Sequence, residues 1–576
     1  MKLIKFFVPV LFLFSCSAKV EITDQMIEEY WHSGKTLPVE MSRMYPWTDQ
    51  KVNDDTGINL LIDLAHQCSF ATLWDMPRQM NNIGYRAVGS MATLNSVLKK
   101  NGQSRIRAYY KPDEKIYPFT WADNPEFNVV ITDQSDNNSQ KYTDKEIEAL
   151  EKFVSDGGGL VIMAPSRKQE QIDTWSIVKL MKAFGASVTE EADTLFDKKY
   201  AVINTDSDTW EVLDKGKAGK TVAAGKPYKK GHVVIAGNPD YFRYKNKDDI
   251  FKEDKIENIK RIIAWVSKGK KPVGGSSPFP MTMGGGGGIY PELEQQQGKI
   301  VLYYAENQNE DLLKTVRDDI PVALKHVEQW LPSKSTDEPM YLILAAGDGG
   351  GWAVNAFRPK ENGIISLKPS GVISIFGHEL AHTMGGPLNS KGEKAGKSPI
   401  PNQGEAHAGW YQGKVIALFD TAAAHKSNRD CNKIFNQENV LTGLDLSKHY
   451  ENEEGRKIWK YGTAWNKVWY IWQKLDDRYG PEWYPRWRWI QNNRWADTPA
   501  KNLTWDEMVE DMSIAVGEDL FPFFIKLGTT LQKNNIGEIV YAGETLKLKE
   551  APIELTLAGN VRIEDITDYT KPIIVK

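Results

Sequence analysis

The chain has 576 residues, of which 41% are hydrophobic and 26% charged, so it is long enough for several domains and has an ordinary globular composition. Its 72 Lys and Arg against 76 Asp and Glu give a formal charge of -4, which offers no electrostatic basis for binding nucleic acid. Only 3 Cys are present, too few for a disulfide framework or for a zinc site built from four cysteines.

The N-terminus has the pattern of an export signal. A basic start precedes an apolar stretch over 6–14, which is shorter than the roughly 20 residues of a membrane-spanning helix. The next residues, Leu13-Phe14-Ser15-Cys16, resemble a bacterial lipobox, in which Cys16 becomes the lipid-bearing N-terminus; an ordinary secretory signal is the alternative. We expect a signal peptide at 1–15, a lipidated tether at 16–50, and an exported cell-envelope lipoprotein at the outer membrane.

Strand and helix patterns alternate over 51–272. Asn59–Asp63 and Phe127–Asp133 are apolar runs that each end in a carboxylate, as expected of buried strands. A helix with Thr143 or Asp144 as its cap follows the second run, and the three glycines from Gly157 end it. Such alternation predicts a doubly wound parallel sheet.

This first segment resembles the class I glutamine-amidotransferase-like domains in its strand, helix, triple-glycine and strand order. Catalysis in such a domain needs a nucleophilic Cys on a tight turn flanked by Gly. Cys68 follows His66 and Gln67 and has no such flank, so we interpret it as a buried thiol in a non-catalytic domain, with a nucleophile as the alternative.

The remainder of the chain divides at a glycine-rich linker expected over 273–298. Five consecutive glycines end at Gly288, but no Gly-Lys-Ser/Thr follows them, which excludes a phosphate-binding P-loop. We expect an α+β domain over 299–540, with a helical, Trp-rich subdomain, and a small β appendage over 541–576. The Trp residues have helical spacing, which favours core packing over a sugar-binding platform.

The most informative motif is Gly377-His378-Glu379-Leu380-Ala381-His382. On a helix the two histidines lie one turn apart on one face and can bind one metal ion together. Glu379 lies beside His378 and can act as general base on a metal-activated water. The alternative is a histidine pair that serves only in packing.

A catalytic zinc ion usually has three protein ligands. The metzincin continuation with a third His is absent after His382, and the next candidates are Glu405 and His407. Glu405 would suit a gluzincin, in which a second helix supplies the ligand, although His407 could ligate instead. His407 or Tyr411 could otherwise stabilise the oxyanion, and the sequence leaves that choice open.

Residues 299–540 resemble the enhancin-like metallopeptidases, a gluzincin group (peptidase family sixty) that includes mucin-directed enzymes. The resemblance rests on Gly377–His382, Glu405, the aromatic stretch Trp469–Tyr484, and Asp506–Gly528. It implies a zincin-type fold and a glycoprotein or mucin-like substrate.

The resemblance also implies Zn²⁺ on His378, His382 and Glu405, with Glu379 as base. We therefore expect a monomeric, surface-anchored zinc metalloendopeptidase that hydrolyses peptide bonds of glycoproteins. The segment Gly363–Leu367 would be an edge strand that pairs with substrate, or an ordinary strand of the sheet. The alternative function is a lipid-anchored glycan-binding protein that uses the peptidase fold as a scaffold.

Overall fold

The computed structural model describes residues 55–66, 79–80, 82–98, 105–110, 117–123, 126–134, 140–165, 175–243, 253–272, 288–289, 291–330, 340–345, 350–354, 360–366, 369–384, 396–397, 403–419, 471–472, 474–480, 482–494, 501–526, 529, 531–541, 543–551 and 573–575. Cys16 and Cys68 lie outside these ranges, so the predictions about them are not tested. In the described part of the chain, no helix combines the length and the apolar character needed to cross a membrane.

The first unit is built on a ten-stranded sheet. Its strands, in spatial order, are β4 (Tyr117–Asp123), β3 (Arg105–Tyr110), β12 (Gly288–Ile289), β2 (Arg86–Ser90), β1 (Asn59–Asp63), β5 (Val129–Asp133), β6 (Gly159–Met163), β11 (Gly231–Ala236), β10 (Thr221–Tyr228) and β9 (Glu211–Lys215). The six strands from β12 to β11 are parallel, and the flanking pairs are antiparallel. The predicted α/β class is therefore confirmed for this unit.

Short helices and a separate β-ribbon complete the first unit. They are α4 (Leu94–Val97), α5 (Asp144–Ser155), α6 (Ser176–Ala183), η3 (Pro239–Phe242), α7 (Glu253–Val266), η4 (Ser267–Gly269) and the ribbon of β7 (Ala186–Leu195) and β8 (Lys198–Thr205). Of the two candidate caps of α5, Thr143 is the cap, because it forms a capping box with Glu146, and Asp144 is the first residue of the helix. Gly157 follows the helix with a φ of 114°, a conformation that glycine adopts without strain.

The second unit contains a five-stranded sheet and three helices. Its strands, in spatial order, are β13 (Leu293–Gln297), β14 (Ile300–Tyr304), β15 (Met340–Ala345), β17 (Lys360–Ile365) and β16 (Gly350–Val354), and its helices are α8 (Glu310–Trp330), α9 (Pro369–Met384) and α10 (Gln403–Ala417). Of the two interpretations of Gly363–Leu367, the described residues bear out the ordinary strand of the sheet and not the edge strand, because β17 lies between β15 and β16. Strand β16 takes the outer position on this side of the described sheet.

The C-terminal part is mainly helical in the described residues. It contains α14 (Trp483–Arg494), α15 (Trp505–Val516), α16 (Phe521–Lys526) and the short strand pairs β18 (Gly396–Lys397) with β19 (Lys501–Asn502) and β20 (Glu518–Asp519) with β23 (Lys549–Glu550). A three-stranded sheet of β22 (Glu544–Lys547), β21 (Glu538–Tyr541) and β24 (Ile573–Val575) lies at the end, where a β appendage is expected. Trp472, Trp483 and Trp487 are fully buried, which confirms core packing for these three.

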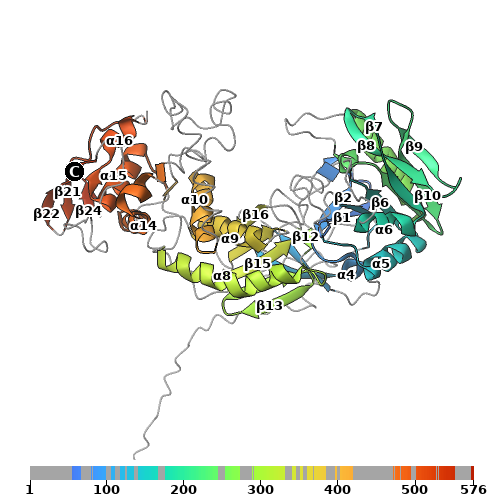
Figure 1. Ribbon diagram of the computed structural model, residues 1–576, viewed down its shortest axis with the longest axis horizontal. Coiled ribbons are helices and arrows are strands. Elements are labelled where there is room, and N and C mark those ends of the chain that lie inside the picture. The colour runs from blue at the N-terminus through green and yellow to red at the C-terminus, as the bar shows by residue number, and fades with distance from the viewer. Residues whose placement is uncertain are drawn as a thin grey trace, which may run out of the picture.

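Strands of the second sheet contribute side chains to two apolar cores, and one of these is the core of the ten-stranded sheet. Alternate residues of β14 and β15 point to opposite faces, as the pleat of a strand requires. Ile300 and Leu302 join the core formed with α8, α9 and the C-terminal helices, while Val301 and Tyr303 join the core of the ten-stranded sheet. Figure 1 shows the second unit between the first unit and the C-terminal helices.

The range expected to be a linker, 273–298, contributes to both sheets. Gly288–Ile289 pairs with β2 and β3 in the first sheet, and Leu293–Gln297 pairs with β14 in the second. The chain therefore passes from one sheet to the other within a few residues, and both sides of the passage are hydrogen-bonded.

Candidate functional site

Helix α9 carries the predicted metal-binding motif. It spans Pro369–Met384, so His378, Glu379 and His382 lie on one continuous helix, as predicted. The helix begins at Pro369, which fits the preference of proline for the first helical turn. It ends just before Gly385-Gly386-Pro387, residue types that stop a helix.

The motif lies at the boundary between core and surface. Glu379 is 5% exposed, whereas His378 is half-buried. Val372, Phe376 and Leu380 of the same helix are in the core. The side chain of His382 lies outside the described set, although its backbone is helical.

Helix α10 packs directly on α9. Gly377 permits this approach, because a Cβ atom built on it would lie 2.8 Å from the Cβ of Val415. Ser374 and Gln412 lie one turn before Gly377 and Val415 on their respective helices, and the side-chain amide of Gln412 donates a hydrogen bond to the hydroxyl of Ser374. The glycine that precedes the metal motif therefore sets the distance between the two helices.

Glu405 and His407 lie in the first half of α10. Their side chains are outside the described set, so the structure confirms their helix but does not choose between them as third ligand. At the other end of α10, Lys414 forms an ion pair with Asp476, and its ammonium lies 5.0 Å from the centre of the Trp410 ring. Burial raises the pKa of the Asp476 carboxyl, and the charge of Lys414 opposes that rise.

Tyr411 is fully buried in an aromatic cluster. Its ring centre lies 5.7 Å from that of Trp410 and 5.7 Å from that of Tyr484, both in edge-to-face geometry. This environment favours a packing role for Tyr411. Its predicted role in oxyanion stabilisation is not tested.

The donor set fits zinc by its chemistry. Imidazole nitrogens and a carboxylate are the usual ligands of catalytic zinc, and two of the donors are one helical turn apart. Among the side chains that the structure describes, no three His, Cys, Asp or Glu residues are arranged so that they could hold a metal ion, but that set excludes His382, Glu405 and His407. The predicted zinc site is therefore not tested.

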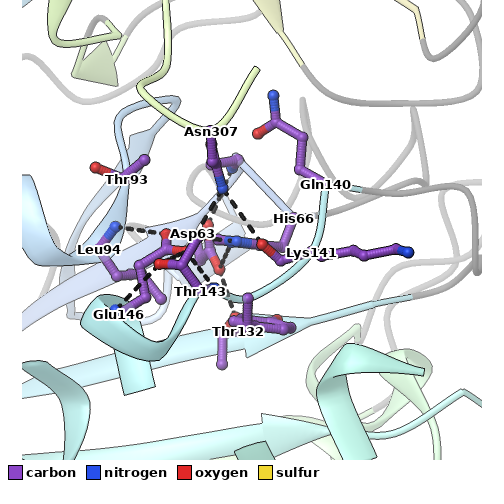
Figure 2. Close-up of polar contacts among 12 residues, drawn as sticks. Asp63, His66, Thr93, Leu94, Thr132, Gln140, Lys141, Thr143, Glu146 and Asn307 are labelled. Atoms are coloured by element: carbon purple, nitrogen blue, oxygen red, sulfur yellow. Dashed lines mark hydrogen bonds and ion pairs between the residues drawn. The ribbon is translucent and has the colours of Figure 1, made fainter. Parts of the chain in front are cut away.

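A second polar cluster lies in the first unit, at the carboxyl ends of β1 and β5, and Figure 2 shows it. The Nδ1 of His66 lies 2.8 Å from Asp63 Oδ2, and its Nε2 lies 3.4 Å from Glu146 Oε1. The His66 ring stacks on Tyr142, with 4.0 Å between ring centres and 8° between ring planes. Asp63, His66 and Glu146 are all 0% exposed, so solvent does not reach them.

The charges of this cluster depend on one another. Burial lowers the pKa of His66, but the carboxylates of Asp63 and Glu146 outweigh it and raise the value to about 10. Burial also opposes ionisation of Glu146, yet the charge of His66 and hydrogen bonds from Thr143 lower its pKa to about 2. Both shifts favour the charged forms of His66 and Glu146, so the two side chains stabilise each other as a buried ion pair.

Asp133 lies beside the cluster, and burial outweighs the favourable charges of Arg243 and His66 on it. It is 0% exposed, and within the described part of the chain neither of its carboxylate oxygens has a hydrogen-bond partner. Burial and the nearby charge of Asp63 raise its pKa to about 8. No sequence motif marks this cluster; the one local signal is that two apolar strands, β1 and β5, each end in Asp.

The comparisons with known proteins give no family. No protein-family model and no curated protein matches the chain. Among solved structures, the "mmIFT52 N-terminal domain" is 11% identical, with coverage of 36% of this chain and 97% of that chain and a TM-score of 0.24. A cytoplasmic protein from Salmonella typhimurium is 9% identical, with coverage of 36% and 98% and a TM-score of 0.22. A GH42 beta-galactosidase, Gan42B, is 13% identical, with coverage of 36% and 30% and a TM-score of 0.20. TM-scores this low do not establish a shared fold.

Proposed function

We propose that the protein is a zinc-dependent metalloendopeptidase in which Glu379 is the general base. The observation that carries the proposal is helix α9, which holds His378 and His382 one turn apart with Glu379 between them. The close packing of α10, the helix that contains Glu405, supports it.

The five-stranded sheet supports a peptide substrate. Strand β16 is one of the two outer strands of the described sheet, lies on the side nearer β17, and runs antiparallel to it. An outer strand can pair with an extended peptide through its free backbone groups. We therefore assign substrate pairing to Gly350–Val354 in place of the interior segment Gly363–Leu367.

His378, His382 and Glu405 would hold the metal ion. Zinc there would polarise the scissile carbonyl and make a water molecule more acidic. The residues supply the donor types of a catalytic zinc site, two imidazoles and a carboxylate.

Glu379 would move the protons. Its carboxylate would accept a proton from the attacking water and deliver it to the leaving amine. Because Glu379 is only 5% exposed, few competing water molecules would contact it. The rigid helix fixes its direction relative to His378.

Substrate and location are further parts of the proposal. The resemblance of 299–540 to enhancin-like peptidases supports a glycoprotein or mucin-like substrate. The N-terminal signal and Cys16 support export and a lipid anchor in the cell envelope.

The test is Glu379→Gln in the full chain, with Glu482→Gln as a matched control. Glu482 is an exposed carboxylate whose side chain is 74% accessible in a surface ion pair with Arg486. We expect Glu379→Gln to retain zinc, measured by elemental analysis, and to lose about 10²- to 10⁴-fold in the rate of mucin cleavage. The control should cleave like the wild type.

Equal cleavage by wild type and Glu379→Gln would contradict the role of the base. Cleavage of mucin compared with enzymatically deglycosylated mucin would show whether a glycan is required. Wild-type protein that binds no zinc would instead favour a glycoprotein-binding scaffold.

A further inference from the structure

The carboxyl ends of β2, β1 and β5 form the edge at which doubly wound sheets usually bind a ligand. Here that edge is built from Asp63, Thr132 and Asp133, and all three are 0% exposed. Thr132 donates a hydrogen bond to Asp63 and contacts the Tyr142 hydroxyl at 2.6 Å. The usual ligand edge of the first unit is therefore closed.

Part of the cover comes from the second unit. Glu292, just before β13, accepts hydrogen bonds from the backbone N–H of Thr93 at 3.1 Å and from its hydroxyl at 2.6 Å. The same carboxylate accepts a bond at 2.9 Å from the N–H of Glu306, in the turn between β14 and α8. One acidic side chain thus connects the loop after β2 with the second unit.

The β14–α8 turn makes further contacts at this edge. The Asn307 amide nitrogen lies 3.4 Å from the carbonyl oxygen of Lys141 and 3.5 Å from Glu146 Oε2. The Gln140 amide donates to the Gln308 side-chain oxygen at 2.5 Å. Figure 2 shows Asn307 directly above the pair of His66 and Glu146.

The contact between the two units involves a buried charge, the carboxylate of Glu146. Glu146 Oε1 accepts a bond from the N–H of Leu94 at 3.1 Å and neighbours His66, while Oε2 faces Asn307. Glu146 therefore joins the start of α4, the imidazolium and the second unit. Since Glu146 is 0% exposed, loss of a partner would leave a buried charge without compensation.

We propose that the first unit is an intramolecular docking domain whose partner is the second unit of the same chain. Its closed carboxyl edge binds Glu292 and the β14–α8 turn in place of a small ligand. By fixing the carboxyl end of β14, where Leu293 of β13 pairs with Tyr304, the first unit positions the sheet on which α9 packs. The proposal rests on contacts that do not involve the metal motif, so it stands or falls separately from the peptidase activity.

Hydrogen–deuterium exchange of two full-length variants, one in each unit, tests the docking. Glu292→Ala changes only the second unit, and we expect exchange about tenfold faster at residues 93–98 and 140–150 of the first. Thr93→Ala changes only the first unit, and we expect a similar increase at residues 300–313 of the second. The control Glu191→Ala breaks the exposed ion pair with Lys220 and should change neither region.

The reciprocal design excludes general destabilisation. A variant that merely weakens the whole fold would also speed exchange in β10 and β11, and the proposal expects those strands to remain unchanged. Faster exchange confined to the mutated unit in both variants, or a uniform increase over the whole protein, would overturn the proposal.

Discussion

His66 carries its charge in the interior of the first unit. Removing an ion from water is costly, and a buried ion pair is stable only when each charge has compensating partners. His66 has Asp63 on one side, Glu146 on the other and the Tyr142 ring stacked against it. Asp133 beside them has a buried carboxyl group that accepts no hydrogen bond from any residue the structure describes.

The pKa directions predict how stability depends on pH. The folded-state pKa of Asp133 is raised from 3.8 to about 8, so ionisation of this carboxyl destabilises the fold progressively between those values. The folded-state pKa of His66 is raised from 6.5 to about 10, so its contribution is complete below pH 6.5 and is lost towards pH 10. Glu146, with a pKa lowered from 4.5 to about 2, contributes above 4.5 and loses its effect below that.

We therefore expect the first unit to be most stable near pH 4 and to lose stability towards pH 9. Relative to the wild type, Asp133→Asn should gain about 4 kcal/mol between pH 5 and pH 9, because the amide cannot ionise and each pH unit up to about 8 costs the wild type about 1.4 kcal/mol. The groups that face Asp133 are Asp63, His66, Tyr142 and Arg243. Thermal unfolding of wild type and variant at both pH values gives the comparison.

Asp208→Asn is the control for this pH series, because Asp208 is exposed. The difference in stability between the Asp208→Asn variant and the wild type should change little with pH. If the difference in stability between Asp133→Asn and the wild type is the same at pH 5 and pH 9, the charge of Asp133 does not govern how the stability of the first unit depends on pH.

At the level of elements, the contact between α9 and α10 determines the candidate metal site. Gly377 has no side chain, and a Cβ there would meet three atoms of Val415 between 2.8 and 3.2 Å. In an isolated helix, Gly→Ala is stabilising by about 1 kcal/mol. Here overpacking against Val415 should outweigh that gain.

We expect Gly377→Ala to lower stability by about 1–3 kcal/mol and to weaken zinc binding, since α10 must move away from α9. Gly377→Ala combined with Val415→Ala should recover part of the loss, because two of the three close atoms are removed. Unfolding midpoints and zinc titrations measure both effects. Unchanged or higher stability of the single variant would mean that the helices are not as tightly packed as described.

Local patterns predicted the elements well where one segment contains the whole signal. The cap at Thr143 and the histidine spacing of α9 are examples, and both are confirmed. Strand order is not local: β17 precedes α9 in sequence yet lies inside the sheet, because β16 folds back beside it. The buried cluster is non-local too, since Glu146 and His66 are far apart in the chain and meet only when β1 and α5 pack together.

At the level of the whole molecule, the second sheet connects the other parts. Val301 and Ile343 pack into the core of the first unit, and Leu302 and Leu342 pack into the core shared by α8, α9 and the C-terminal helices. A strand whose two faces are both buried cannot shift without disturbing both cores. Changes at the docking contact are therefore expected to reach α9 through β14 and β15.

The most direct measurement is X-ray diffraction at the zinc absorption edge from crystals of the full-length protein grown with zinc. The account predicts one strong anomalous peak between α9 and α10, about 2.0–2.2 Å from nitrogen atoms of His378 and His382 and an oxygen of Glu405. A peak at bonding distance from His407 instead of Glu405 would change only the residue assigned as the third zinc ligand. No peak at α9, in protein that is folded and exposed to zinc, would contradict the proposed metallopeptidase.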